Sequence, residues 1–219
     1  MIRTSADFST QPGSAQDAIA LTFDDGPDPV WTPQVLEALR AVDARAAFFV
    51  TAPLARRFPY LISEILTDGH AVELHCTRHV RHTEQAREQV EADVRSGLRD
   101  LRKLGVSPWF WRPPWGVLAP WTTEIAEEFG LRLALWTADT HDWRGDNATE
   151  MLKAISPGLG PGAVVLMHDG LGPGARRSGC EETVALIGTL VASIRSLGCE
   201  PVTIDLVQRT SFTQPRSAV

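Results

Sequence analysis

Residues 20–27 read ALTFDDGP, an apolar run that ends in Asp24 and Asp25 and is followed by a Gly-Pro pair. The apolar residues 18–23 predict a buried strand. Because neighbouring side chains of a strand point to opposite faces, two adjacent aspartates serve one site only where the strand ends and the chain twists. The Gly-Pro pair supplies such a turn. The alternative is an ordinary Asp-rich turn with no further role.

The composition is that of a globular protein. Of the 219 residues, 43% are hydrophobic and 22% charged, and the formal net charge is −6. No Lys/Arg-rich run is present, so we expect no nucleic-acid or anionic-membrane partner. No apolar segment approaches the ~20 residues that span a bilayer, and the first residues lack the pattern of a signal peptide. We therefore expect a cytoplasmic protein, or a secreted one if a leader has been removed; the sequence leaves the oligomeric state open.

Three cysteines, Cys76, Cys180 and Cys199, argue against a disulfide framework because their number is odd. A predicted helix separates Cys180 from Cys199 and would hold them roughly 25 Å apart. A disulfide requires Cα atoms within about 7 Å. We expect this pair to be reduced.

Strands alternate with helices along the chain. The predicted strands are residues 18–23, 46–50, 70–74, 109–111, 131–137, 163–167 and 201–204. The predicted helices begin at Thr32 and continue at residues 53–67, 84–104, 120–129, 147–155 and 181–197. This alternation is typical of a parallel α/β fold, either an open doubly wound sheet or a (β/α) barrel. In both architectures the carboxyl ends of the strands carry the functional site.

The segment HCTRH at residues 75–79 follows one predicted strand. His75 and His79 share a face if the segment makes one helical turn, and both rings then reach one ion at about 2.0–2.1 Å. Two histidines and one carboxylate form a common open zinc set, for which Asp25 is the candidate carboxylate. Surface loop histidines are the alternative. We expect His82 to lie either at the surface or in contact with one of the metal-ligating residues.

Other chemically suggestive segments also follow strands. In WRPPWG, residues 111–116, the prolines lack N–H groups, so the first free backbone donor after Arg112 is that of Trp115. Arg112 can pair with a carboxylate, or lie at the surface of a rigid aromatic loop. Residues 136–143, WTADTHDW, offer two aspartates, a histidine and two indoles. His168 ends an apolar strand and is suited to proton exchange, although a structural role is the alternative.

The joint occurrence of these segments carries a family resemblance. The ordered motifs are TFDDG (22–26), HCTRH (75–79), RPPWG (112–116), DTHDW (139–143) and LMH (166–168). Together they resemble the polysaccharide deacetylase family, also called the NodB-homology domain or carbohydrate esterase family 4. The resemblance implies a distorted (β/α) TIM-like barrel with a single NodB-homology catalytic domain over residues 18–205. Residues 1–17 would then be a loose lead-in and residues 206–219 a polar tail.

The same resemblance implies a metal-dependent hydrolase that removes an acetyl group from an N-acetylated amino sugar or oligosaccharide. The family pattern makes Asp25, His75 and His79 the metal ligands, usually for Zn²⁺ and sometimes for Co²⁺, Ni²⁺ or Mn²⁺. Asp24 would be the general base toward the metal-bound water, oriented by Arg112.

By the same pattern, the backbone N–H of Trp115 would hold the oxyanion. His168 would protonate the leaving amine, with Asp139 tuning it. Trp143 and Leu166, with Trp115 at the rim, would line the substrate pocket.

Some positions depart from the family pattern. Cys76 stands where Ser or Thr is usual, which raises the question of an additional metal ligand. Trp115 replaces Tyr or Phe, and residues 73–74 read Glu-Leu in place of Gly-Asn. The loop 170–179 carries Arg176 and Arg177 and is either a solvated loop or a substrate-facing lid whose arginines meet an acidic or polyol group.

Two alternatives to the N-acetylated sugar remain open. One is an intracellular deacylase of a small N-acyl metabolite, carrying an acetyl or formyl amide. The other is a non-catalytic carbohydrate-binding relative, against which the intact set of base, ligands and acid argues.

Overall fold

The computed structural model describes residues 17–208. The strands are β1 (Ala18–Asp24), β2 (Ala47–Thr51), β3 (Ala71–Cys76), β4 (Phe110–Trp111), β5 (Arg132–Leu133), β6 (Ala138–Asp139), β7 (Val164–His168) and β8 (Glu200–Val202). The α-helices are α1 (Trp31–Ala41), α2 (Ala52–Arg57), α3 (Pro59–Thr67), α4 (Arg87–Lys103), α5 (Thr122–Glu128), α6 (Ala148–Ile155), α7 (Glu181–Ser196) and α8 (Ile204–Gln208).

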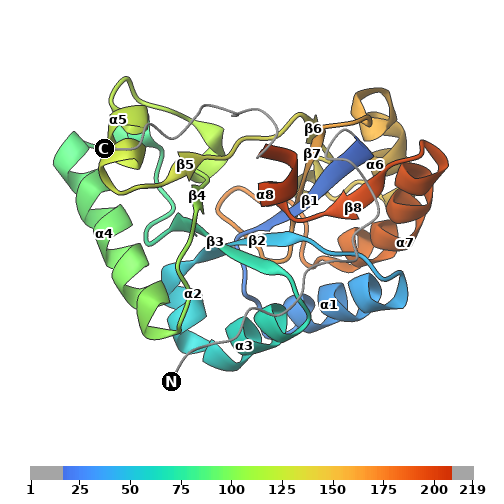
Figure 1. The fold of residues 1–219 in the computed structure, drawn as a ribbon, viewed down its shortest axis with the longest axis horizontal. Coiled ribbons are helices and arrows are strands. Elements are labelled where there is room, and N and C mark those ends of the chain that lie inside the picture. The colour runs from blue at the N-terminus through green and yellow to red at the C-terminus, as the bar shows by residue number, and fades with distance from the viewer. Residues whose placement is uncertain (1–16, 209–219) are drawn as a thin grey trace, which may run out of the picture.

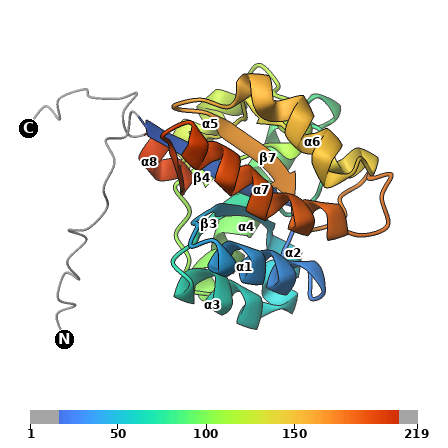
Figure 2. The same cartoon turned by 90° about the vertical axis from the view of Figure 1, so that its right-hand side faces the viewer.

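The strands form one curled parallel sheet in the order β5-β4-β3-β2-β1-β7-β6, with β8 added to β1. Figure 1 shows the strands in the middle of the molecule, with α4, α3, α1, α7 and α6 around their outer side. Helices that follow distant strands meet there, since α1 packs against α7 and α6 against α7 (Figure 2). Between residues 17 and 208, β5 and β6 end the strand order without pairing with each other. The predicted distorted (β/α) barrel is thereby confirmed.

β1 lies at the centre of the sheet because it pairs with β2, β7 and β8. Its large side chains, Ile19, Leu21 and Phe23, face the helices and belong to the main core. Its small ones, Ala18 and Ala20, belong to a second cluster inside the barrel. Side chains alternate along a strand, so the interior face of β1 continues with the next even-numbered residues and ends at its terminal aspartate. The packing of β1 therefore directs one carboxylate into the barrel mouth.

The structure differs from the predicted elements where the chain bends. The predicted helix 53–67 is two helices, α2 and α3, because Pro59 disfavours the helical conformation at Phe58, whose ψ is 59°. Within the predicted strand 131–137 only β5 is regular, and β6 begins just after it at Ala138. The Ala134 carbonyl between the two strands accepts a hydrogen bond from the side chain of Arg112.

The end of the described chain also differs from expectation. Residues 204–208 form α8, where the sequence predicts the end of a strand and the start of a polar tail. Ile204 and Val207 are buried in the interior cluster with Ala18.

The rest of the predicted lead-in and tail, residues 1–16 and 209–219, lies outside the described residues. Within residues 17–208 no helix has the length and apolarity required to cross a membrane.

The turn after β1 is packed against a buried carboxylate. Asp25 has the left-handed φ of 72°, and a methyl group placed on Gly26 would lie 2.3 Å from Oδ2 of Asp169. Asp169 is fully buried and accepts a hydrogen bond from the Thr32 hydroxyl at 2.5 Å. Burial raises the pKa of Asp169 to about 7. Only glycine therefore fits at residue 26 while Asp169 keeps its place.

We predict that Gly26→Ala lowers the free energy of unfolding by about 1–3 kcal/mol, because the new methyl group overlaps Asp169. The loss should shrink in an Asp169→Ala background, since the two sites are in contact. Urea unfolding of the four proteins measures both values. Gly160→Ala is the control, because a methyl group there meets open space. Equal losses in the two backgrounds would contradict the proposed contact.

Candidate active site

One pocket of about 390 Å³ opens at the carboxyl ends of the strands. Nine of the ten predicted site residues line it: Asp24, Asp25, His75, His79, Trp115, Asp139, Trp143, Leu166 and His168. The tenth, Arg112, is fully buried and bonds Asp24. Parallel pairing explains the gathering, because Asp24 stands directly beside His168 in the β1–β7 register. The segments that are far apart in sequence thus meet in one place.

Asp25, His75 and His79 form a compact cluster. Oδ1 of Asp25 lies 3.4 Å from Nε2 of His75 and 3.2 Å from Nε2 of His79. Their candidate ligand atoms all lie within 4.8 Å of one another. The two histidines do not share a helical turn as expected, because β3 continues to Cys76. His75 therefore projects from the strand itself and His79 from the loop that follows.

The hydrogen bonds of this cluster fit a bound cation. Nδ1 of His75 donates to the carbonyl of Arg112 at 2.7 Å, which leaves the lone pair of Nε2 facing Asp25. Among the described residues, Asp25 Oδ1 and His75 Nε2 are buried without a hydrogen-bond partner. Burial opposes ionisation of Asp25, but the proximity of the His75 and His79 rings outweighs it and holds the pKa of Asp25 well below its usual range. A buried carboxylate oxygen and a buried imidazole nitrogen without hydrogen-bond partners are suitable ligand atoms for a divalent metal such as zinc.

Cys76 and His82 do not belong to this cluster. Among residues 17–208, the group assembled to hold a metal there consists of Asp25, His75 and His79. Burial raises the pKa of the Cys76 thiol well above its usual value, so the thiol stays neutral. His82 is buried, and its Nδ1 lies 3.0 Å from the hydroxyl of Thr122. Burial lowers its pKa to about 4.

Asp93 on α4 holds the loop between the two histidines. Its two carboxylate oxygens accept the backbone N–H groups of Thr77 and Arg78, both at 2.8 Å. The Thr77 hydroxyl also donates to the backbone carbonyl of Asp93. Asp93 cannot be recognised from the sequence, since nothing in a helical pattern of charges distinguishes an aspartate that turns inward.

Arg112 binds Asp24 inside the barrel. Its Nη1 donates to Asp24 at 2.6 Å and to the Thr22 hydroxyl at 2.9 Å, and the guanidinium lies 4.0 Å from the centre of the Phe49 ring. Both partners of this ion pair are buried. The guanidinium therefore compensates the charge of Asp24 and fixes the direction of its carboxylate.

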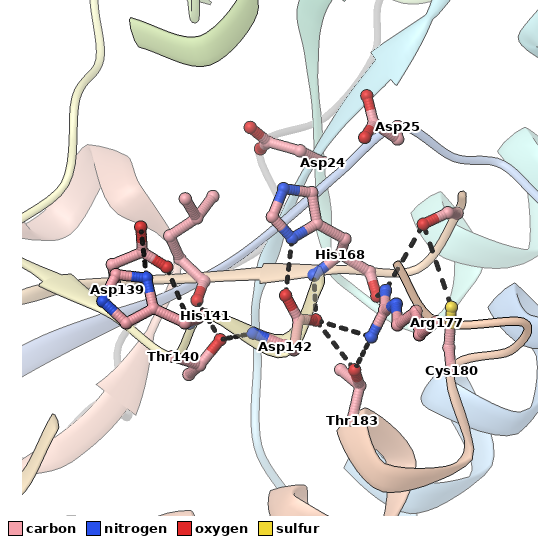
Figure 3. A network of polar contacts seen from close by, with 12 residues as sticks. Asp24, Asp25, Asp139, Thr140, His141, Asp142, His168, Arg177, Cys180 and Thr183 are labelled. Carbon is pink, nitrogen blue, oxygen red and sulfur yellow. Dashed lines mark hydrogen bonds and ion pairs between the residues drawn. The ribbon is translucent and has the colours of Figure 1, made fainter. Parts of the chain in front are cut away.

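His168 is bonded to Asp142 and not to Asp139, which corrects the expectation for Asp139. Nδ1 of His168 lies 2.7 Å from Oδ1 of Asp142, as Figure 3 shows. Asp139 instead accepts the backbone N–H of His141 at 2.7 Å. The two aspartates are three residues apart on either side of His141, whose left-handed φ of 55° reverses the chain. The adjacency of Asp142 to Trp143, a predicted pocket residue, is the sequence signal that favours it.

His168 and Asp142 form a hydrogen-bonded dyad in which both pKa values are shifted. Burial would lower the pKa of His168, but the charge and hydrogen bond of Asp142 raise it to about 9. Burial would raise the pKa of Asp142, yet His168 and Arg177 hold it at about 2. His168 is therefore an imidazolium at neutral pH, able to give a proton from Nε2.

Trp115 and the loop after β7 complete the pocket. Trp115 takes a left-handed φ of 54°, and its ring meets that of His79 at 4.2 Å between centroids. In the loop, a methyl group on Gly172 would lie 1.9 Å from Oδ2 of Asp25. The predicted pair Arg176 and Arg177 is split, since Arg176 is exposed and lies over Trp143, whereas Arg177 turns inward to Asp142.

We predict that Asp93→Asn weakens binding of zinc by about tenfold or more, because an amide NH₂ would face one of the loop N–H groups and loosen both histidines. Titration of the metal-free protein with zinc against a competing chelator measures the affinity. Asp100→Asn is the matched control, a buried aspartate on the same helix whose ion-pair partners are Arg56, Arg99 and Lys103. An equal loss in both variants would argue against a specific role for Asp93.

Comparison with known proteins finds relatives over most of the chain. The profile of the family described as Polysaccharide deacetylase matches residues 12–134. A peptidoglycan-N-acetylglucosamine deacetylase of Bacillus cereus is 33% identical over 193 residues, which is 87% of this chain and 88% of that protein. A chitooligosaccharide deacetylase of Azorhizobium caulinodans is 31% identical over 84% of this chain and 90% of its own. The chain spans only 38% of the PgdA deacetylase of Listeria monocytogenes, at 35% identity.

Solved structures agree with these relatives. A peptidoglycan N-acetylglucosamine deacetylase in complex with 4-naphthalen-1-yl-N-oxidanyl-benzamide superposes with a TM-score of 0.82 and 26% identity over 90% of both chains. A family 4 carbohydrate esterase from Streptomyces lividans in complex with acetate gives a TM-score of 0.76 at 27% identity over 84% of this chain and 91% of its own. Because the family profile matches more than half of the chain and relatives above 30% identity cover most of it, this chain belongs to the polysaccharide deacetylase family.

Proposed function

We propose that this protein is a metal-dependent deacetylase that releases acetate from N-acetylglucosamine units of a glycan. The observation that carries the proposal is the cluster of Asp25, His75 and His79 in one pocket with Asp24 and His168. Within this cluster Oδ1 of Asp25 and Nε2 of His75 are buried without a hydrogen-bond partner among the described residues. A carboxylate base, a cation site and an imidazolium acid are the groups that amide hydrolysis requires.

Zinc is the proposed ion, held by one carboxylate and two imidazoles; Co²⁺, Ni²⁺ or Mn²⁺ can take the same donors. Such an ion lowers the pKa of water and polarises the amide carbonyl. Asp25, His75 and His79 would hold it, and His75 is already oriented by its bond to the Arg112 carbonyl.

Asp24 and His168 divide the proton transfers in this proposal. Asp24 has one carboxylate oxygen bound by Arg112, so its charge is compensated and its position is defined. It would accept the proton of the attacking water. His168, an imidazolium with Asp142 on its Nδ1, would deliver a proton from Nε2 to the nitrogen of the leaving amine. Asp24 has a cationic partner and His168 an anionic one, which is the arrangement expected for a base and an acid in one site.

The pocket wall supports an acetyl substrate. Leu166 and Trp143 supply apolar surface to the pocket, and Trp115 also lines it, with its ring against His79. The backbone N–H of Trp115 is the proposed donor to the oxyanion, since two prolines before it have none. The relatives named for peptidoglycan and chitooligosaccharides support an N-acetylglucosamine glycan as the substrate class.

The substrate class is tested by acetate release. We expect release from N-acetylglucosamine oligomers and from peptidoglycan fragments, and little from small N-acetyl or N-formyl amines. The assay should be run with zinc-loaded protein. Turnover confined to the small amines would overturn the glycan proposal and favour the metabolite deacylase.

We predict that Asp24→Asn and His168→Ala each lower kcat by about a hundredfold or more, the usual loss when a general base or acid is removed. A chelator should abolish activity, and added zinc should restore it. Thermal melts establish that the variants remain folded. Asp43→Asn is the control, because Asp43 is exposed and has a positive φ that asparagine tolerates. Wild-type kcat in either variant would refute the assigned role.

A second prediction concerns pH. Asp142→Asn removes the charge that raises the pKa of His168 to about 9, so the alkaline limb of kcat/KM should move to lower pH by about one unit or more. Asp139→Asn should leave that limb in place, because Asp139 contacts His141 instead. Profiles of kcat/KM against pH compare the two variants. The opposite pattern would return the tuning role to Asp139.

A further inference from the structure

Asp142 receives four hydrogen bonds although it is almost completely buried. Oδ1 faces the ring of His168. Oδ2 accepts the backbone N–H of His168 at 2.9 Å, Nη1 of Arg177 at 3.0 Å and the hydroxyl of Thr183 at 2.7 Å. Figure 3 shows these contacts converging on one carboxylate. With three donors on Oδ2, rotation of the carboxylate would break several bonds at once, so Oδ1 stays with the ring.

Arg177 binds more than this carboxylate. Its Nη2 donates to the carbonyl of His168 at 3.0 Å and lies 3.4 Å from the carbonyl of Gly170. Its Nη1 also contacts the hydroxyl of Thr183. The side chain is only 6% exposed. One guanidinium therefore joins the carboxylate of Asp142, the end of β7 and the start of α7. Its Nη1 and Nη2 atoms are occupied by these bonds and are not free to bind substrate.

Arg177 is also a counter-ion of Asp142 that does not depend on the protonation state of His168. When His168 is protonated, Asp142 has two cationic partners. When the ring has given its proton away, a buried carboxylate would lack a counter-ion if Arg177 were absent, which is strongly unfavourable. Arg177 keeps a positive charge in both states, because guanidinium does not deprotonate in proteins.

We propose that Arg177 is a positioning residue for the acid step: it holds Oδ2 of Asp142 so that Oδ1 faces His168, and it remains as the counter-ion when the ring is neutral. The proposal rests on the proposed function for its catalytic meaning. The sequence neighbour Arg176 has no such contact, since its side chain is exposed over Trp143.

The expected titration follows from the charges that face His168. Asp142, Asp24 and Asp25 raise the pKa of the imidazolium. Arg177 stands behind Asp142 and opposes them, because a nearby cation disfavours a second positive charge. Loss of its charge should therefore make His168 a weaker acid.

The test compares Arg177→Met, Arg177→Lys and the matched control Arg176→Met in zinc-loaded protein. For Arg177→Met we expect kcat to fall about tenfold or more with little change in KM, and the alkaline limb to move up by about one pH unit. Arg177→Lys keeps the positive charge but cannot make the several hydrogen bonds of a guanidinium. The alkaline limb of the pH profile should therefore stay in place while kcat falls. Arg176→Met should leave the limb where it is in the wild type.

NMR titration of the His168 ring in the same proteins measures its pKa without turnover. A raised pKa in Arg177→Met, with the wild-type value in Arg177→Lys and Arg176→Met, supports the proposal. An unchanged or lowered pKa in Arg177→Met overturns it. If Arg177→Met fails to fold, Arg177→Lys and Thr183→Val, which removes a donor to Oδ2, decide instead: unchanged kcat in both overturns the proposal. A protein that releases no acetate but shows the raised pKa would contradict the proposed function and leave the positioning network standing.

Discussion

The buried ion pair between Arg112 and Asp24 is the interaction on which the site depends. Arg112 crosses the barrel interior from the end of β4, binds the last residue of β1 and donates to the carbonyl of Ala134 beyond β5. Its own carbonyl accepts the Nδ1 proton of His75. Removal of one partner from such a buried pair costs about 3–5 kcal/mol, because a charge is left without compensation. One residue thus links Asp24, the candidate metal ligand His75 and the segment after β5.

Adjacent aspartates reach different tasks because the backbone changes conformation between them. Asp24 is the last residue of a strand whose interior face carries small side chains, so its carboxylate enters the barrel. Asp25 has a left-handed φ and turns toward the two histidines. The turn that follows can form because Gly26 has no side chain to overlap the carboxylate of Asp169. Packing of a small residue against a buried carboxylate therefore permits two neighbouring side chains to face one pocket.

Much of this arrangement could be predicted from the sequence, and the errors have physical causes. Strand ends in a parallel sheet gather at one edge, so the grouping of Asp25, His75, His79 and His168 followed from alternation and strand order. The partner of His168 did not, because Asp139 and Asp142 flank a reversal at His141 that no periodicity reveals. Arg177 was equally hidden, since a Gly/Pro loop has no pattern that distinguishes an inward side chain from an exposed one.

The loop 170–179 shows why composition alone misjudges such a segment. Four glycines and a proline suggest mobility, yet two of the glycines are required by close approach, since a methyl group on Gly170 or Gly172 would overlap Asp25. Five residues later Arg177 binds Asp142, and the backbone of Arg176 donates to the carbonyl of Trp143. One loop therefore packs against Asp25 and also binds Asp142. A shift of this loop would displace the candidate ligand Asp25 and the pair of Asp142 and His168 together, so the two halves of the site are coupled through it.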